Sequence, residues 1–206
     1  MKKTLHLILG VLLLPLALGA QSLPKAEDAF EKGDYVAALA QYKQLMQSAT
    51  GDERLHAQLR YAACQFGLGE YLNAAKTIWG YTLPENDLWK ARFLLYRIQL
   101  SGQTSSVYRR LLNERQIDSK DAQNDPEAWT KDEWEARITQ DYETLWAMRA
   151  ALINAPIERE TLILNVKATD TQRIPTLFDY VVFEWQRHLT AQKPVTLARL
   201  ENAEFL

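Results

Sequence analysis

Two short stretches of this 206-residue chain repeat one another: Gly33-Asp34-Tyr35-Val36-Ala37-Ala38 and, 36 residues later, Gly69-Glu70-Tyr71-Leu72-Asn73-Ala74. In each, an apolar helical pattern ends at glycine, an acidic residue and a tyrosine follow, and a small residue stands three positions after the tyrosine. Self-similarity at a period of about 20 to 50 residues is typical of a fold that stacks one supersecondary unit. The two stretches therefore predict two copies of a helical hairpin.

The same spacing of apolar residues extends beyond these stretches. Apolar side chains recur every three or four residues along nearly the whole chain, and no alternating strand pattern persists. The sequence therefore predicts an all-α fold of helical hairpins followed by a second helical bundle. The first hairpin is expected over about residues 25–46 and the second over about 55–79.

Each hairpin has three positions with a predicted structural role. The glycine can adopt the left-handed conformation that ends a helix, the tyrosine is expected to fill the space beside the turn, and the alanine lets two helices approach closely. These positions are Gly33, Tyr35, Ala38, Gly69, Tyr71 and Ala74.

This pattern resembles the tetratricopeptide repeat, whose consensus also has an acidic and aromatic turn followed by a small residue. The resemblance covers two repeats, from Lys25 to about Gly80. It departs from the family at Thr50-Gly51, where a proline is usual, and in a spacing that exceeds the family's period of about 34 residues. A third pair is expected over residues 88–112, turning at Gly102, either as a degenerate repeat or as a capping hairpin.

The composition of the chain becomes polar after the predicted repeat region of residues 21–112. Residues 113–128 form a polar linker, and residues 129–206 form the second helical unit. Thr130-Lys131-Asp132-Glu133 reads as a capping box that opens a helix to about Asn154. A short helix is expected after Pro156, and a final amphipathic helix from Leu177 to Leu189.

Residues 1–20 have the features of a secretory signal: a basic start, an apolar run too short to span a membrane, and closing small residues. Cleavage is expected after Gly19 or Ala20, and an uncleaved membrane anchor is the alternative. The chain is therefore predicted to be exported to the periplasm or cell envelope, touching the membrane only through this segment before cleavage.

The net charge and the absence of known motifs argue against nucleic-acid binding and against enzymatic activity. The formal net charge of −2 provides no field for nucleic acid. The single cysteine, Cys64, lies in an apolar helical run and is interpreted as a buried thiol, while His56 and His188 are interpreted as surface or structural residues. No HExxH, GxSxG or glycine-rich nucleotide motif occurs, and the acidic residues 118–125 lack the spacing of a calcium loop. No catalytic residue, metal ligand or cofactor is predicted, and an envelope enzyme is disfavoured.

Aromatic residues are abundant, and two interpretations of them stay open. They either pack within and between helices, or some line a concave surface that anchors a peptide. The candidate protein-binding aromatics are Tyr42, Trp79, Trp89 and Tyr96.

A second resemblance lies in the C-terminal half. The stretch Gln172-Arg173-Ile174-Pro175-Thr176-Leu177-Phe178-Asp179-Tyr180-Val181 resembles a motif in the N-terminal helical region of bacterial α2-macroglobulin-like proteins, especially those of Bacteroidetes. Such proteins commonly read Pro-Thr-Leu-Tyr-Asp-Phe-Leu before an amphipathic helix. Locally, Pro175 suits a first helical turn, and Thr176 or Asp179 can cap it. The motif positions with a structural role are Pro175, Thr176, Leu177, Phe178, Asp179 and Tyr180.

The resemblance is clear over residues 129–189, but Val182-Phe183-Glu184 stands where the family has a His-Arg pair. The family's protease-trapping β-sandwich domains and its thioester motif have no counterpart here, so no catalytic residue carries over. The resemblance implies a non-enzymatic protein-interaction module that is an accessory part or fragment of a protease-inhibitor system. A stand-alone envelope scaffold and a truncated remnant without separate function are the alternatives. The expected partner is a protein or peptide, with no small-molecule cofactor.

Overall fold

The fold is all-α, as the apolar spacing predicts, and is described here from a computed structural model of residues 22–108, 125–166 and 169–191. The predicted signal, the core of the polar linker and the apolar C-terminal tail lie outside these ranges. The helices are α1 (Leu23–Glu31), α2 (Tyr35–Ser48), α3 (Gly51–Gly67), α4 (Tyr71–Gly80), α5 (Asp87–Val107), α7 (Lys131–Ala147), α8 (Arg149–Leu152) and α9 (Leu177–Ala191), with 3-10 turns η2 (Pro126–Ala128) and η3 (Ile157–Arg159).

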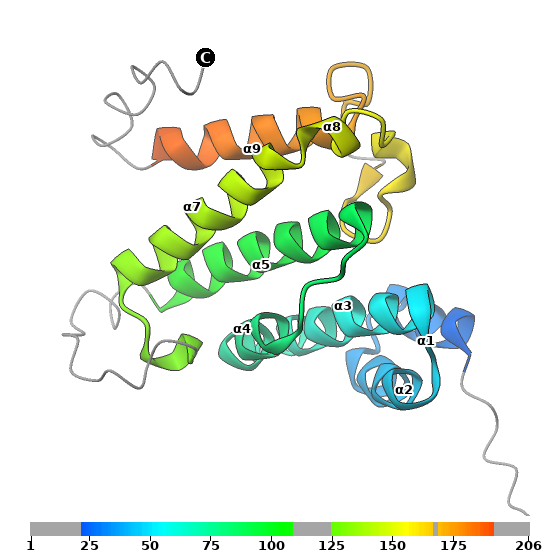
Figure 1. Cartoon of the computed structure of the whole chain (residues 1–206). Helices are drawn as coiled ribbons and strands as arrows, with labels where there is room; N and C mark the ends of the chain where they lie inside the picture. The colour runs from blue at the N-terminus through cyan, green and yellow to red at the C-terminus, as the bar shows by residue number, and fades with distance from the viewer. Residues whose placement is uncertain (1–21, 109–124, 167–168, 192–206) are drawn as a thin grey trace, which may run out of the picture.

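Successive helices pack as hairpins (Figure 1), and α5 lies between the α3–α4 pair on one side and α7 with α9 on the other. One hydrophobic core continues from Leu59 on α3 through α5 to Leu189 on α9, while a smaller core packs α1 and α2 against α3. The two predicted halves of the chain therefore share a core through α5. No helix in the described ranges is both long and apolar enough to cross a membrane.

The two glycine turns have the same hydrogen bonds, 36 residues apart. The Gly33 amide donates to the Phe30 carbonyl at 3.0 Å and the Asp34 amide to the Ala29 carbonyl at 3.0 Å. The Gly69 amide likewise donates to Phe66 at 3.0 Å, and Glu70 to Gln65 at 2.9 Å. This is the Schellman pattern, which requires the left-handed backbone seen at both glycines, with φ of 76° and 80°.

The side chains around the turns repeat as well. Phe30 and Tyr35 pack edge to face at 5.5 Å between ring centroids, and Phe66 and Tyr71 do so at 4.8 Å. Ala38 and Ala74 are completely buried where their helices cross. The six positions therefore have matching backbone conformations, ring contacts or burial in the two hairpins.

The first hairpin meets the second through Gly67, the last residue of α3. The Tyr35 ring lies so close that a Cβ atom at position 67 would stand 2.7 Å from two of its carbons. A contact below 3.0 Å requires one of the groups to shift. Gly67 is therefore needed for this close approach, and not for an unusual backbone conformation.

The structure corrects the expected third hairpin. Gly102 lies inside α5, which continues for another turn to Val107, so no turn occurs there. Buried Ser101 and Thr104 on either side keep the helix packed, which offsets the cost of about 1 kcal/mol of a glycine inside a helix. Leu111 and Leu112 lie outside the described residues.

Helix α7 opens with the predicted capping box, in which the Thr130 amide donates to the Glu133 carboxylate at 2.8 Å and the Glu133 amide to the Thr130 hydroxyl at 3.3 Å. It ends at Ala147, earlier than expected, and Met148 separates it from α8. Trp129 and Thr130, which immediately precede α7, are buried, at 1% and 8% exposed.

The segment between α8 and α9 differs from the expected short helix. Pro156 is followed by the 3-10 turn η3, and an isolated antiparallel bridge joins Pro156 to Thr176. The segment is held on α5 by Arg92, which donates two hydrogen bonds to the Glu160 carboxylate at 2.8 and 3.0 Å. Glu160 is 1% exposed, so this long connection is anchored by a buried ion pair.

Helix α9 begins with a second reciprocal cap. The Thr176 amide donates to the Asp179 carboxylate at 3.0 Å, and the Asp179 amide donates to the Thr176 hydroxyl at 3.2 Å. This confirms the expected capping role of both residues. Pro175 precedes the cap, outside the first helical turn where it was expected, and its carbonyl accepts a hydrogen bond from the Ile157 amide.

Candidate functional site

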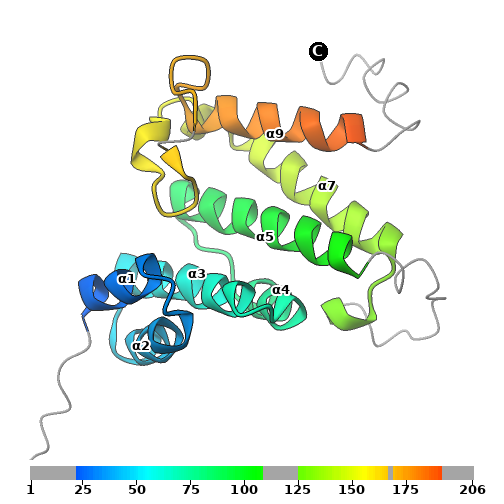
Figure 2. The same ribbon diagram turned by 180° about the vertical axis from the view of Figure 1, so that it is seen from behind.

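Three helices from the C-terminal two thirds of the chain surround an open groove. Helices α5 and α9 form its walls, and α7 crosses between them (Figure 2). The groove has a volume of about 630 Å³. Its position follows from the packing, because α7 lies against both α5 and α9 and holds the two walls apart.

The floor of the groove is apolar and its walls carry polar groups. Leu95, Ile98 and Ile138 are buried beneath it together with Tyr142. The remaining lining residues are Gln99, Gly102 and Gln103 on α5 and Tyr180, Glu184, Arg187, His188 and Ala191 on α9. An apolar floor with a few polar groups at the walls is the usual character of a binding cleft.

The charged and titratable groups of the groove have partners within the protein. Arg187 donates to the Glu184 carboxylate at 2.8 Å, and the His188 imidazole lies 3.6 Å from the Glu135 carboxylate of α7. Across the groove, the Gln99 amide donates to the Tyr180 hydroxyl at 3.4 Å. The polar surface available to a bound molecule therefore carries hydrogen-bonding groups and little net charge.

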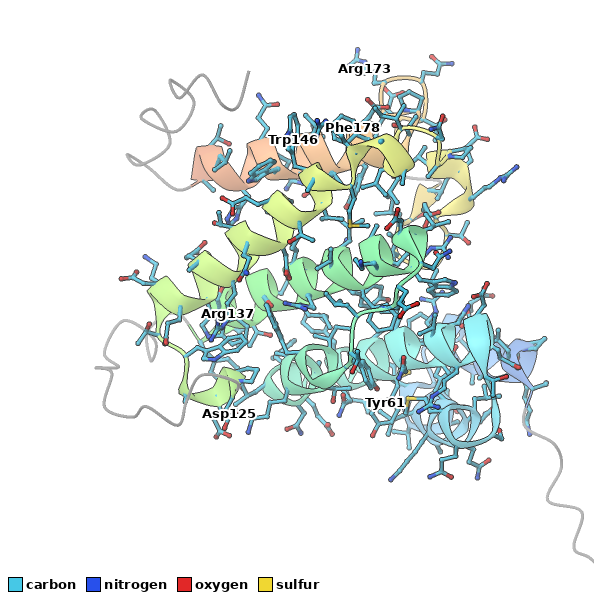
Figure 3. The ribbon with its side chains drawn as sticks, in the orientation of Figure 1. Tyr61, Asp125, Arg137, Trp146, Arg173 and Phe178 are labelled. Atoms are coloured by element: carbon cyan, nitrogen blue, oxygen red, sulfur yellow. The ribbon has the colours of Figure 1, made fainter. Side chains whose placement is uncertain are left out.

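Aromatic rings fix α9 on α7 behind the groove. The rings of Tyr142 and Trp185 are stacked, with centroids 5.8 Å apart and planes at 5°, and His188 lies 5.4 Å from the Tyr142 ring. Farther along, Trp146 and Phe178 meet at 5.4 Å, where Figure 3 shows them together at the crossing of α7 and α9. These contacts preform the groove, since they set the angle between its floor and one wall.

A buried ionic cluster lies on the opposite side of α5 from the groove. The Arg97 guanidinium donates to the Asp141 carboxylate of α7 at 3.0 Å and lies 3.4 Å from the ring centroid of Trp79 on α4. Burial raises the pKa of Asp141 to about 7, although the Arg97 charge opposes the shift. Burial also lowers the pKa of Arg97.

Tryptophan rings extend this cluster. Trp79 packs edge to face on Trp129 at 5.0 Å, and Trp129 packs on Trp134 at 4.8 Å. The Arg137 guanidinium, whose position Figure 3 labels, lies 4.2 Å from the Trp129 ring centroid. The cluster joins α4, α5 and α7 in a single packed unit.

A second ionic cluster lies in the first hairpin. The Glu27 carboxylate accepts hydrogen bonds from the Tyr42 hydroxyl, from His56 at 2.7 Å and from two atoms of Arg60 at 3.1 Å. Burial tends to raise the pKa of Glu27, but these bonds and the Arg60 charge together lower it to about 2. The carboxylate thus connects α1, α2 and α3.

The structure corrects the peptide-anchor interpretation of the four candidate aromatics. Tyr42, Trp89 and Tyr96 are 0%, 7% and 7% exposed, so their rings are covered by the protein itself. Trp79 is half-buried, covered by Arg97, and its indole N–H donates to the Ser101 hydroxyl at 3.0 Å. They also do not share one surface, because Tyr42 belongs to a different core cluster from the rest.

The remaining sequence-derived site residues have structural roles. Cys64 is buried as expected, and burial raises the pKa of its thiol to about 12. In the motif of residues 175–180, Leu177 enters the core and Tyr180 reaches the groove. No group of three or more His, Cys, Asp or Glu side chains within the described ranges is arranged to hold a metal ion.

Comparison of the chain with protein-family models, with curated proteins and with solved structures found no match. The groove residues on α5 and α9 were missed by the sequence analysis, apart from Tyr180. They lie about 80 residues apart in the chain, as the Gln99–Tyr180 separation shows, and no local motif marks them. Polar residues spaced three or four apart on each helix were the available signal, and such spacing is also typical of any solvated helix face.

Proposed function

We propose that this protein is a non-enzymatic interaction module and that the groove between α5, α7 and α9 is its contact site for a partner protein. The observation that carries the proposal is the groove itself, with its apolar floor and with polar walls on which Arg187 pairs with Glu184. Complementary apolar surface provides binding free energy of about 25 cal/mol per Å² buried, before the costs of association are subtracted. The partner is a protein segment with apolar side chains.

The first two hairpins fit the role of a scaffold. We propose that residues 23–80 are two tetratricopeptide-like repeats, because their turns share one hydrogen-bond pattern and one aromatic pair at a spacing of 36 residues. In such repeats each hairpin packs on the next and supports a rigid surface. Here they support α5, which forms one wall of the groove.

The biological setting is a further proposal. We propose that the protein acts in the periplasm or cell envelope, on the basis of the signal-like residues 1–20. The resemblance of residues 129–189 to the helical region of α2-macroglobulin-like proteins suggests an accessory role in a protease-inhibitor system. In this chain, Thr176 and Asp179 of the motif at residues 175–180 form the reciprocal cap at the start of α9.

The test fills the groove without disturbing the core. Gly102 lies on the groove wall with no atom within 4 Å of an added Cβ, so Gly102→Phe places a ring in open space. Gly80 at the end of α4 also has no atom within 4 Å of an added Cβ, and it does not line the groove, which makes Gly80→Phe the matched control. Each protein would carry a photo-crosslinking residue in place of Ala191, an exposed residue that lines the groove on α9, and be irradiated in envelope extract.

The proposal requires a crosslinked partner that is recovered with the parent protein and with Gly80→Phe, and that is lost with Gly102→Phe. Equal recovery with all three proteins would show that the groove is not the contact site. Recovery of no crosslinked partner with the parent protein would also contradict the proposal.

A further inference from the structure

We infer that His188 and Glu135 form a pH-sensitive contact, which holds the terminal turn of α9, residues 188–191, on α7 when the imidazole is protonated and releases it when the imidazole is neutral. The contact is a property of this chain alone. Only its consequence for partner binding rests on the proposed function, because His188 and Ala191 line the groove.

The contact joins the end of α9 to the first half of α7. The Nε2 atom of His188 lies 3.6 Å from the Oε2 atom of Glu135. Their side chains are 17% and 33% exposed, so solvent screens this pair less than it screens a fully exposed one. The His188 ring also lies 5.4 Å from the Tyr142 ring, with an angle of 35° between the planes. The imidazole therefore contacts both a carboxylate and an aromatic ring of α7.

Several features of the fold favour the protonated imidazole. The Glu135 carboxylate supplies an opposite charge, and the Tyr142 ring attracts a cation. His188 lies in the last turn of α9, where the negative end of the helix dipole stabilises a cation. Glu184 precedes it by four residues on the same helix, a spacing at which an acidic side chain stabilises a following basic one.

The neighbouring charges of α9 offset one another. Arg187 is the adjacent cation, but it is 65% exposed and donates to the Glu184 carboxylate at 2.8 Å. Glu184 is therefore shared between Arg187 and His188, and Glu135 is the main partner of the imidazole. The two carboxylates and one guanidinium around His188 reach charge balance when the imidazole is protonated.

The other groups that face the imidazole are uncharged in the relevant pH range. Burial raises the pKa of both Tyr142 and Tyr180, so these phenols are neutral below about pH 8. Helix α5 contributes the amides of Gln99 and Gln103 to the same groove. On α8, the Arg149 guanidinium donates to a backbone carbonyl of α7 at 3.4 Å, near the other end of that helix.

The contact is present at low pH and lost as the pH rises. A histidine in an unfolded chain loses its proton near about pH 6.5. A folded state that binds the proton more tightly gains stability below that pH and loses the gain above it. In the terminal turn Leu189 is buried, whereas Thr190 and Ala191 are exposed, so release of His188 leaves the turn held on the core through Leu189. The groove then widens at this end.

Amide hydrogen exchange, measured by NMR on the full chain, tests the opening of the terminal turn. Protection factors are compared at about pH 5.5 and about pH 7.5, on either side of the imidazole titration, because they correct for the intrinsic pH dependence of exchange. The variants are His188→Gln, which is neutral at both pH values, His188→Lys, which is charged at both, and Glu135→Gln, which removes the carboxylate. His56→Gln is the control, since His56 lies on α3 and contacts Glu27 in the first hairpin.

We expect the protection of residues 188–191 in the parent to fall about threefold between the two pH values, the size of a charge effect at a helix end. His188→Lys should keep the high protection at both pH values, and His188→Gln the low one. Glu135→Gln should reduce the response to less than about twofold, and His56→Gln should retain it. Asp141 titrates in all of these proteins, so it does not produce a difference between them.

Three outcomes would overturn the inference: protection in the parent that does not fall with pH, an equal fall in the parent and in His188→Gln, or a full response in Glu135→Gln. The measurement uses no partner protein. Failure of this contact therefore leaves the crosslinking test of the groove unaffected, and a groove that captures no partner leaves the contact unaffected.

Discussion

The carboxylate of Asp141 and the guanidinium of Arg97 lie 3.0 Å apart across the interface of α7 and α5, with side chains only 5% and 12% exposed. The second carboxylate oxygen of Asp141 and the Nε of Arg97 are buried without a hydrogen-bond partner. Desolvation of two charges costs several kcal/mol per ion in proteins, and incomplete hydrogen bonding leaves that cost only partly offset. This is the physical reason that the pKa of Asp141 lies near 7 rather than below its ordinary value.

This pair predicts that the protein is more stable in mild acid than at neutral pH. The folded pKa of Asp141, about 7, is above its ordinary value of 3.8, so the folded state binds the proton more tightly than the unfolded state. The stabilising contribution is complete below about pH 4 and is lost as the pH rises through 7. We expect urea unfolding to show a loss on the order of 2 kcal/mol between about pH 5 and about pH 8.

The matched variant for this prediction is Asp141→Asn, which has no proton to bind. Its free energy of unfolding should change less over the same pH interval than that of the parent. If the parent and Asp141→Asn have parallel pH profiles, Asp141 does not titrate in this interval and its environment is more polar than the structure shows.

Glu27 is predicted to be the main polar contact holding the first hairpin on α3. Glu27→Gln removes the charge that pairs with Arg60, whose side chain is 12% exposed, and disrupts the bonds to Tyr42 and His56. Because a buried cation is then left without its partner, we expect a loss of about 2 to 4 kcal/mol in the free energy of unfolding. Asp28→Asn is the control, since the Asp28–Lys32 pair on the same helix is exposed and should contribute little.

The same carboxylate gives a second, opposite pH effect. The pKa of Glu27 is lowered to about 2 from 4.5, so its contribution is present above about pH 4.5 and is lost as the pH falls toward 2. Acid unfolding of the parent should therefore be steep in that range, and Glu27→Gln should lack this component. A parent curve that coincides in shape with the variant would contradict the assignment.

Gly67 is predicted to tolerate no side chain. In Gly67→Ala the new methyl group would stand 2.7 Å from the Tyr35 ring, and overpacking of this kind costs about 1 to 3 kcal/mol. Gly102→Ala provides the contrast, because it adds a methyl in open space inside a helix and should stabilise by about 0.5 to 1 kcal/mol. Thermal unfolding of both variants tests the pair, and a Gly67→Ala protein as stable as Gly102→Ala would refute the close contact.

Glu160 is predicted to anchor the connection between α8 and α9. Glu160→Gln weakens its paired hydrogen bonds with Arg92, and we expect local opening of residues 156–166 and 169–176 before global unfolding. Hydrogen exchange measured by mass spectrometry should show faster exchange in that segment, with the α1–α2 hairpin unchanged. Glu158→Gln, an exposed residue two positions earlier, is the control.

Local signals in the sequence were sufficient for much of the fold. The two glycine turns and the capping box at Thr130 were predicted correctly because each is encoded within about six residues by backbone conformation and side-chain hydrogen bonds. Gly102 shows the limit of such signals. The glycine turn at Gly69 follows the end of α3, whereas Gly102 lies inside α5 and does not end it. Packing on both sides of Gly102 outweighs the low helix propensity of glycine.

The burial of the candidate aromatics and the position of the groove depend on contacts between residues far apart in the sequence. The candidate aromatics Tyr42, Trp89 and Tyr96 are covered by residues from other helices, and hydropathy cannot show which aromatic will be covered. The groove depends on α9 returning to α7 after the connection from residue 153 to residue 176, whose described residues include no α-helix. Its glutamines have no distinguishing neighbours in the sequence.

The absence of a side chain at Gly67 also limits which hairpin can occupy the second position in the chain. Glu31 occupies the matching place in the first hairpin, 36 residues earlier. An identical copy of the first hairpin in second position would therefore direct a glutamate at the Tyr35 ring. The two turns share their backbone hydrogen bonds, but the helices before them differ at this position. If the second hairpin arose as a copy of the first, the glutamate at position 67 had to become glycine before the copy could pack on the first hairpin.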